Sequence, residues 1–159
     1  MKYLYFDNDD TESYVHNEEV VSKFFKRYDE YLKEFDEISE AFPKLFLREY
    51  KKCYFHDYSI QSFDLIHTKH GFEICLRFLN ENNETIQITY HNVKLFSSQL
   101  NWNYRSDILY VEILKYDDKC FSQELSISSN ETLYIIFKSL SFKKMNTPTI
   151  STGKDTEKA

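Results

Sequence analysis

The residues best suited to chemistry are an adjacent histidine–aspartate pair, His56 and Asp57, and three further histidines, His67, His70 and His91. Imidazole and carboxylate groups are ordinary ligands of catalytic zinc, so His56 and Asp57 would suit a small metal-dependent hydrolase. Such a pair needs further ligands, which a helical bundle supplies from its other helices. Here the pair opens a segment with strand-like alternation, and His67 and His70 fall in a predicted turn. We therefore expect His56 and Asp57 to fix the start of the first strand, with no metal bound.

Other catalytic motifs are missing from the sequence. The three cysteines, Cys53, Cys75 and Cys120, are an odd number without CxxC spacing, which argues against disulfides and zinc knuckles. None lies in a recognisable nucleophile motif, and the chain has no GxSxG sequence. The two glycines, Gly71 and Gly153, cannot form a phosphate-binding loop. The sequence therefore predicts a protein that is not an enzyme and has no cofactor.

Aromatic residues are unusually abundant, with 13 Tyr and 14 Phe in 159 residues. Because Ala and Gly are too rare to pack a core, most of these rings must fill it. Trp102 and Tyr104 are different, since they lie in the polar stretch SSQLNWNYRSD between predicted strands. Tyr and Trp are favoured at protein interfaces, so we predict that these two residues contact a partner.

The acidic charge is concentrated at one end of the chain. Residues 1–40 carry twelve acidic and five basic side chains, whereas the whole chain has a net charge of −6. A globally acidic protein is poorly suited to bind nucleic acid or an anionic membrane, because both require basic surface. A basic protein partner fits this charge, and we predict that it meets four carboxylates that precede the first helix. These are Asp7, Asp9, Asp10 and Glu12.

Helical periodicity is confined to the first third of the chain. Apolar residues three and four apart predict a helix over 18–38, with Asn17 as its N-cap. A second helix is predicted to begin at Pro43 and to end near Lys52. We expect the first helix to cover one face of the sheet through Phe24, Phe25, Tyr28 and Phe35, packed against Phe72, Ile74, Leu76, Phe78 or their neighbours.

The period then changes to the alternation of strands, predicted at 59–67, 72–78, 86–95, 108–116, 119–128 and 132–143. The apolar phase shifts by one residue after Tyr90, which predicts a bulge at His91–Asn92. Short polar joins indicate hairpins. We predict an α+β fold with N-terminal helices packed on an antiparallel β-meander of about six strands, a single domain over 1–146 and a disordered tail over 147–159.

Several segments of the chain resemble a domain family of unknown function, number 4085, from low-GC Gram-positive bacteria. The matching segments are FHDYSI, FEICLRF with ETIQITYHNVKLF, NWNYRSDILYVEILKY and LYIIFKSLSF, which together span about 55–143. The resemblance implies a helical part followed by an antiparallel sheet. Because the family has no assigned activity, it implies no catalytic residues.

The hypothesis that fits these observations is a non-catalytic inhibitor that binds a protein. In size and charge the chain is similar to bacterial immunity proteins, which neutralise toxins, and a basic toxin nuclease would suit its acidity. A prophage-encoded inhibitor of a host defence enzyme would bind its partner through the same electrostatic attraction. The alternatives are a small metal-dependent hydrolase using His56 and Asp57, and a scaffold or assembly protein. With no signal peptide and no apolar membrane span, a cytoplasmic location is expected, and the oligomeric state stays open.

Overall fold

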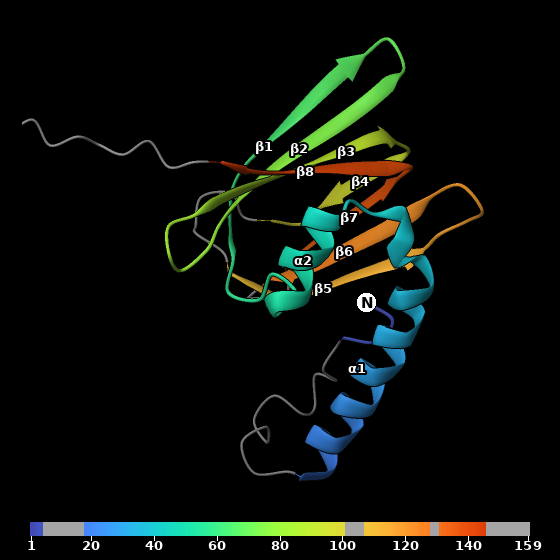
Figure 1. The fold of residues 1–159 in the computed structure, drawn as a ribbon, viewed down its shortest axis with the longest axis vertical. Coiled ribbons are helices and arrows are strands. Elements are labelled where there is room, and N and C mark those ends of the chain that lie inside the picture. The colour runs from blue at the N-terminus through green and yellow to red at the C-terminus, as the bar shows by residue number, and fades with distance from the viewer. Residues whose placement is uncertain (5–17, 101–106, 128–130, 146–159) are drawn as a thin grey trace, which may run out of the picture.

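A computed structural model describes residues 1–4, 18–100, 107–127 and 131–145 (Figure 1). The α+β class is confirmed. Helix α1 (Glu18–Ile38) is followed by a 3₁₀ turn, Ser39–Ala41, and by α2 (Lys44–Cys53). Both helices begin within one residue of their predicted starts. The described residues then form β1 (Ser59–Thr68), β2 (Gly71–Leu79), β3 (Thr85–Val93), β4 (Leu95–Ser98), β5 (Ile108–Lys115), β6 (Phe121–Ile127), β7 (Glu131–Phe137) and β8 (Ser139–Met145).

The eight strands form two antiparallel four-stranded sheets, in the orders β1-β2-β3-β8 (sheet A) and β4-β7-β6-β5 (sheet B). The chain passes between the sheets at two bends. Strand β3 of sheet A continues into β4 of sheet B, and β7 of sheet B continues into β8 of sheet A. At the bend, the Lys94 N–H donates to the Ile136 carbonyl (2.8 Å) and the Lys138 N–H donates to the His91 carbonyl (3.1 Å). The predicted meander therefore holds for β1-β2-β3 and for β5-β6-β7. The pairs β3–β8 and β4–β7 join these two runs, and the described residues form eight strands where about six were predicted.

The predicted bulge at His91–Asn92 is confirmed. The β2–β3 register shifts between Phe72 and Ile74, which pair with Val93 and Tyr90. Asn92 has a φ of 52°, in the left-handed region that Asn adopts more readily than most residues. The extra residue brings Val93 back to the apolar side and starts the bend toward β4.

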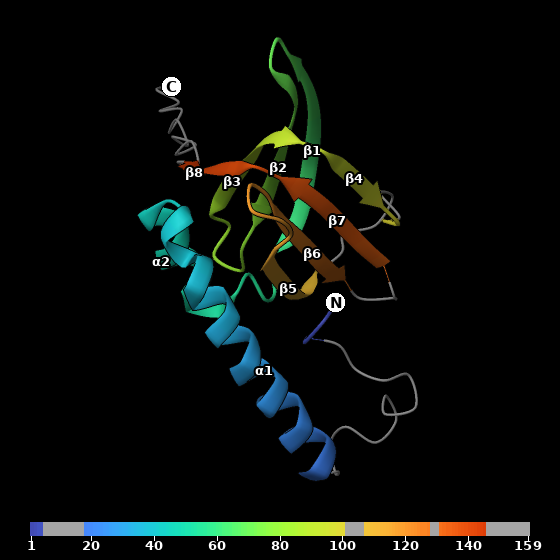
Figure 2. The same ribbon diagram turned by 90° about the vertical axis from the view of Figure 1, so that its right-hand side faces the viewer.

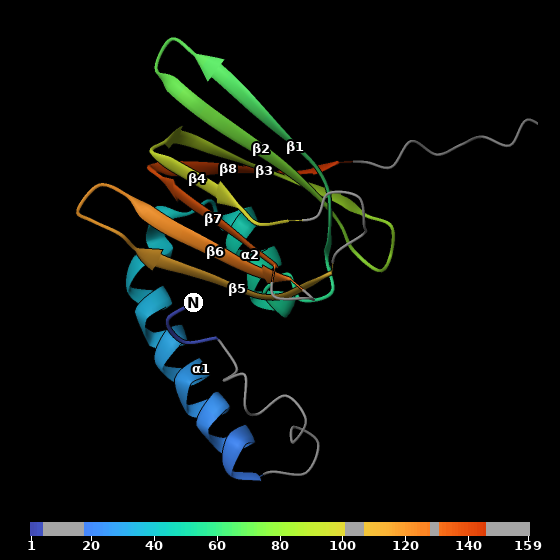
Figure 3. The same cartoon turned by 180° about the vertical axis from the view of Figure 1, so that it is seen from behind.

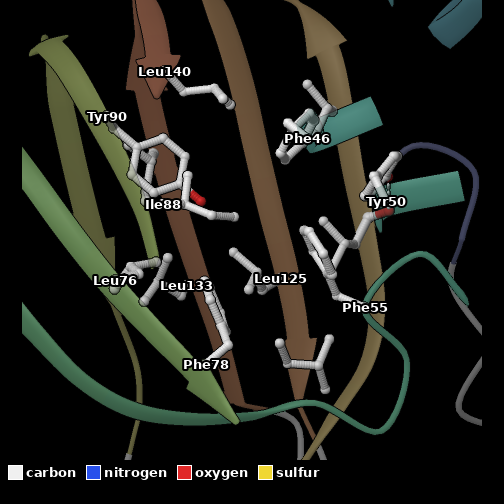
Figure 4. Packing of buried hydrophobic residues seen from close by; sticks show 14 of the residues in the cluster. Phe46, Tyr50, Phe55, Leu76, Phe78, Ile88, Tyr90, Leu125, Leu133 and Leu140 are labelled. Carbon is white, nitrogen blue, oxygen red and sulfur yellow. Dashed lines mark hydrogen bonds between the residues drawn. The ribbon is translucent and has the colours of Figure 1, made fainter. Parts of the chain in front are cut away.

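The core lies between the two sheets and α2. Figure 4 shows Phe46 and Tyr50 of α2, together with Phe55, facing Leu125 of β6 and Phe78 of β2. The ring of Phe55 lies 6.0 Å from that of Phe78. These are the contacts that the sequence assigned to the first helix. Helix α2, which contacts β8, and Phe55, which follows it, take that place, and α1 runs beside sheet B (Figure 2).

The expected packing of α1 needs correction for this reason. Phe35 is fully buried, but its neighbours are aromatic rings of the helical region, Phe42 and Tyr50. Phe24 contacts Tyr110 of β5, with ring centroids 5.5 Å apart, and Phe25 is 58% exposed. Among the described residues, no helix is long and apolar enough to cross a membrane.

Two buried tyrosine hydroxyls fasten the helices to β5, an edge strand of sheet B. The Ile113 N–H donates to the Tyr31 hydroxyl (3.0 Å), and the Tyr50 hydroxyl donates to the Val111 carbonyl (2.9 Å). The two hydroxyl oxygens are 2.5 Å apart. Buried backbone groups at a sheet edge require partners, and here side chains replace a neighbouring strand.

The outer face of β5 holds the first residues of the chain. The backbone N–H groups of Lys2 (2.8 Å), Tyr3 (2.7 Å) and Leu4 all donate to the carboxylate of Glu112. Glu112 is buried, and these charge-assisted hydrogen bonds compensate for its lost hydration. The sequence shows only a glutamate within an apolar strand, which does not reveal this role.

Candidate functional site

The structure places His56 and Asp57 at the rim of a cleft of about 300 Å³. The cleft lies between the C-terminal end of α2, the segment 54–58 and the turn between β2 and β3. These segments approach each other at the end of strands β1 and β2 that lies away from the hairpin tip (Figure 3). The lining residues are Glu49, Lys52, Cys53, His56, Asp57, Tyr58, Asn80, Glu81, Asn82 and Glu84.

The backbone of one wall has an uncommon conformation. Tyr54, Phe55 and Asp57 have φ values of 50°, 56° and 64°, which non-glycine residues adopt rarely and at some cost in energy. The buried ring of Phe55 holds the segment in place from inside the core. From outside, the Asp57 N–H donates to the Ile108 carbonyl (3.0 Å), and the Ile108 N–H donates to the Tyr58 carbonyl (2.8 Å). The segment thus aligns β1 with β5, and Asp57 contributes to the start of the strand through its backbone.

The side chains of His56 and Asp57 bind each other. Nδ1 of His56 lies 2.8 Å from Oδ2 of Asp57, and both side chains are about half exposed. No group of three or more His, Cys, Asp or Glu residues is placed to hold a metal ion in the described parts of the chain. Cys53 lines the same cleft, but burial raises the pKa of its thiol, with a further increase from the charges of Asp57 and Glu49. A raised thiol pKa is the opposite of what a nucleophilic cysteine requires.

Glu49 forms the floor of the cleft and is almost fully buried. Its carboxylate accepts hydrogen bonds from Lys52 Nζ (3.0 and 3.1 Å), and Lys144 Nζ of β8 lies 3.1 Å away. Burial alone would raise the pKa of Glu49, but the hydrogen bonds from the two lysines outweigh burial and lower it. Glu49 is therefore a charged structural group whose charge is already neutralised within the protein.

The β2–β3 turn supplies the opposite wall and is held by reciprocal hydrogen bonds. Asn80 Nδ2 donates to Glu84 Oε2 (2.8 Å), and the Glu84 N–H donates back to Asn80 Oδ1 (2.8 Å). The turn fixes Glu81 and Glu84 across the cleft from Asp57. Glu49 pairs with three cations, Lys52, Lys144 and Arg48, so the four lining carboxylates exceed the cations around the cleft by one and leave it a small negative charge. This acidic cleft can receive a cationic group.

His67 and His70 lie near the tip of the β1–β2 hairpin, away from the cleft. His67 contacts the ring of Phe72 at 5.0 Å, and His70 lies in the exposed turn at the tip of the β1–β2 hairpin. The structure therefore does not bring them to His56 and Asp57. The predicted partner-binding residues lie outside the described parts of the chain: Asp7, Asp9, Asp10, Glu12, Trp102 and Tyr104.

His91 belongs to a cross-strand network that sequence analysis did not identify. Its Nδ1 lies 2.9 Å from Glu73 Oε1, and its Nε2 lies 3.0 Å from Ser141 Oγ. The order carboxylate, imidazole, hydroxyl is that of a serine-hydrolase triad. Triad chemistry also requires oxyanion donors. Here β2 and β3 are paired on both sides and Ser141 is exposed, so we interpret the network as sheet stabilisation. Glu73 and Ser141 lie 18 and 50 positions from His91, too far apart for a spacing motif in the sequence to reveal the network.

Comparisons with known proteins provide little beyond this geometry. One solved structure, described as an uncharacterized protein from Neisseria gonorrhoeae, aligns with 57% of this chain and 94% of its own chain, at 17% identity and a TM-score of 0.42. A similarity of this size supports no argument about function. No family model and no curated protein matches the chain.

Proposed function

We propose that this protein is a non-catalytic inhibitor that binds a basic protein partner, in the manner of an immunity protein that neutralises a toxin. The observation that supports the proposal is the acidic cleft. Three carboxylates, on Asp57, Glu81 and Glu84, line a cavity whose fourth carboxylate, Glu49, is paired with Lys52, Lys144 and Arg48.

The physical argument rests on how such a cleft acts on a cationic side chain. A concave site lined by charge of one sign focuses the electric field and raises the rate of encounter with an opposite charge. A volume of about 300 Å³ accommodates the end of an arginine or lysine side chain. Toxin nucleases carry such side chains because they bind phosphate groups. Occupying those side chains would block the substrate.

Association kinetics test this proposal once affinity purification from the native host has named the partner. The combined variant Asp57→Asn, Glu81→Gln and Glu84→Gln should lower the association rate several-fold at low ionic strength and weaken its salt dependence. A matched control removes three exposed carboxylates elsewhere, through Glu37→Gln, Glu40→Gln and Asp118→Asn. Equal effects of the two variants would show that overall charge, and not the cleft, attracts the partner.

The acidic segment before α1 allows a separate test. Exchanging its four carboxylates for Asn or Gln should slow association at low salt and leave the melting temperature unchanged. An unchanged association rate would show that the segment serves solubility alone. The residues exchanged are Asp7, Asp9, Asp10 and Glu12.

A hydrolase is the second candidate, because the contact between His56 and Asp57 lies in the same cleft. Metal analysis of the purified protein distinguishes the two functions. Stoichiometric zinc or manganese that is lost in the variant His56→Asn with Asp57→Asn would favour the hydrolase. Protein without metal, and a double variant that loses stability rather than activity, would favour a structural pair.

A further inference from the structure

The acidic cleft carries an excess of a single negative charge, so one proton is enough to cancel it. The lining carboxylates belong to Glu49, Asp57, Glu81 and Glu84. The cations that pair with Glu49 are Lys52 at 3.0 Å, Lys144 at 3.1 Å and Arg48 at 3.6 Å. Four negative and three positive charges leave a balance of −1. A group on the rim that gains one positive charge would therefore bring the cleft to neutrality.

His56 is the lining residue of the type that can gain this charge near neutral pH. Histidine is the only side chain whose ordinary pKa places its charge change between pH 5 and 8. The Nδ1 atom of His56 lies 2.8 Å from Oδ2 of Asp57. Because an ionised carboxylate can only accept, Nδ1 carries the proton of the neutral ring, and Nε2 is the atom that takes up the second proton. Protonation then turns a hydrogen bond into an ion pair and offsets the charge of Asp57.

The titratable groups of α2 that line the same cleft keep their charge state near neutral pH. Burial raises the pKa of Cys53, so this thiol stays neutral. Burial also raises the pKa of Glu49, but hydrogen bonds from Lys52 and Lys144 outweigh burial and lower it, so the carboxylate stays ionised. Helix α2 therefore contributes a constant charge to the cleft.

The groups on the other elements around His56 do not change charge in this range either. Burial raises the pKa of Tyr58, which follows Asp57 in the chain, so its hydroxyl stays neutral. Across the cleft, the β2–β3 turn supplies two glutamates, a side chain that is ordinarily ionised above about pH 5. From β5, the neighbour is the ring of Tyr110, whose centroid lies 6.4 Å from that of His56. His56 is thus the group that changes the charge of the cleft between about pH 5.5 and 7.5.

A cationic side chain of a partner responds to the charge of the cleft as a whole. A concave site of one sign concentrates the electric field, so a positive charge added at its rim weakens the attraction. The side chains of His56 and Asp57 are 48% and 55% exposed, and water screens their interactions. The proton on His56 should therefore lower the affinity by a modest factor rather than abolish binding.

We propose that His56 is a pH switch of the acidic cleft, which attracts a cationic side chain of the partner near neutral pH and holds it more weakly as the imidazole takes up a proton. This regulation rests on the proposed function, because it acts on the same cleft. Acidification also protonates the other four histidines and makes the whole chain less negative. A test must therefore separate the local charge of His56 from the overall charge.

A hexa-arginine peptide, added up to millimolar concentration, serves as the cationic probe. Isotope-edited NMR of the full chain locates its binding through the side-chain amides of Asn80 and Asn82, which line the cleft. At low ionic strength we expect the Kd to rise roughly threefold from about pH 7.5 to about pH 5.5. His56→Gln keeps the position neutral and should remove most of this rise. His56→Lys keeps it charged and should give the weaker binding at both pH values.

His70→Gln is the matched control, because His70 lies in the exposed turn at the tip of the β1–β2 hairpin, and it should keep the wild-type pH dependence. Circular dichroism at both pH values checks that every variant folds. A Kd that is equal at the two pH values, or whose rise survives His56→Gln as well as it survives His70→Gln, would overturn the switch and leave the cleft as the binding site. A probe that shifts neither amide at either pH would overturn the proposed function, and the switch with it.

Discussion

The hydrogen bonds of Tyr31 and Tyr50 to β5 provide a sharp test of what joins the helices to the sheet. The variant Tyr31→Phe removes the partner of the buried Ile113 N–H, and Tyr50→Phe removes the donor to the Val111 carbonyl. Each variant also breaks the contact between the two hydroxyls. Leaving a buried polar group without a partner costs about 1–3 kcal/mol, so each variant should lower the free energy of unfolding by that amount.

The double variant adds a constraint on the magnitude. Each single variant loses two hydrogen bonds, and one of these, between the hydroxyls of Tyr31 and Tyr50, is common to both. The double variant therefore loses three bonds rather than four. The double variant should therefore be destabilised by less than the sum of the two single effects. The difference should equal the free energy that one hydrogen bond contributes, about 0.5–1.5 kcal/mol.

Urea unfolding followed by circular dichroism measures these free energies, with the m-value as a check that the unfolded state is unchanged. Tyr116→Phe is the control, because Tyr116 is 53% exposed and should change stability by less than about 0.5 kcal/mol. Hydrogen exchange at the Ile113 amide should accelerate in Tyr31→Phe more than global destabilisation requires. A Tyr31→Phe variant as stable as wild type, or fully additive single effects, would refute the assignment.

Three further predictions concern stability. Phe35→Ala should lower the free energy of unfolding by about 3–5 kcal/mol, because Phe35 is fully buried, and an unchanged melting temperature would contradict its place in the core. Gln123→Met should be neutral or stabilising by about 1 kcal/mol in urea unfolding, because the buried Gln123 amide makes no hydrogen bond of normal geometry within the described structure; clear destabilisation would show that its interaction with the Tyr90 hydroxyl stabilises the core. Pairing with the lysines lowers the pKa of Glu49 below its unfolded-state value of ~4.3. The carboxylate therefore stabilises the fold fully above that pH, and this contribution is lost as the pH falls through the lower folded-state pKa. The stability difference between wild type and Glu49→Gln should therefore be constant above about pH 5 and shrink below it, and a difference independent of pH down to acid unfolding would count against the pairing.

The amino-acid sequence by itself determined the elements. Periods of 3.6 and 2 are local properties, so α1, α2 and most strands were found close to their observed bounds, and Pro43 marked the start of α2. The predicted strand 132–143 spans both β7 and β8, and β4 lies almost wholly beyond the predicted strand 86–95. The bulge at Asn92 was also visible, because a shift of phase within one strand is a local signal. The α+β class follows from these elements alone.

Tertiary structure decided which elements meet. Alternation shows that a strand has an apolar face, but it does not name the strand or helix that covers that face, so α1 was placed where α2 packs. The pairing of β3 with β8 and the cleft between Asp57 and Glu81 depend on contacts between distant parts of the chain. Buried Glu112 and the tyrosine pair at β5 are satisfied by groups far away in sequence, and only the folded chain brings those partners within hydrogen-bond distance.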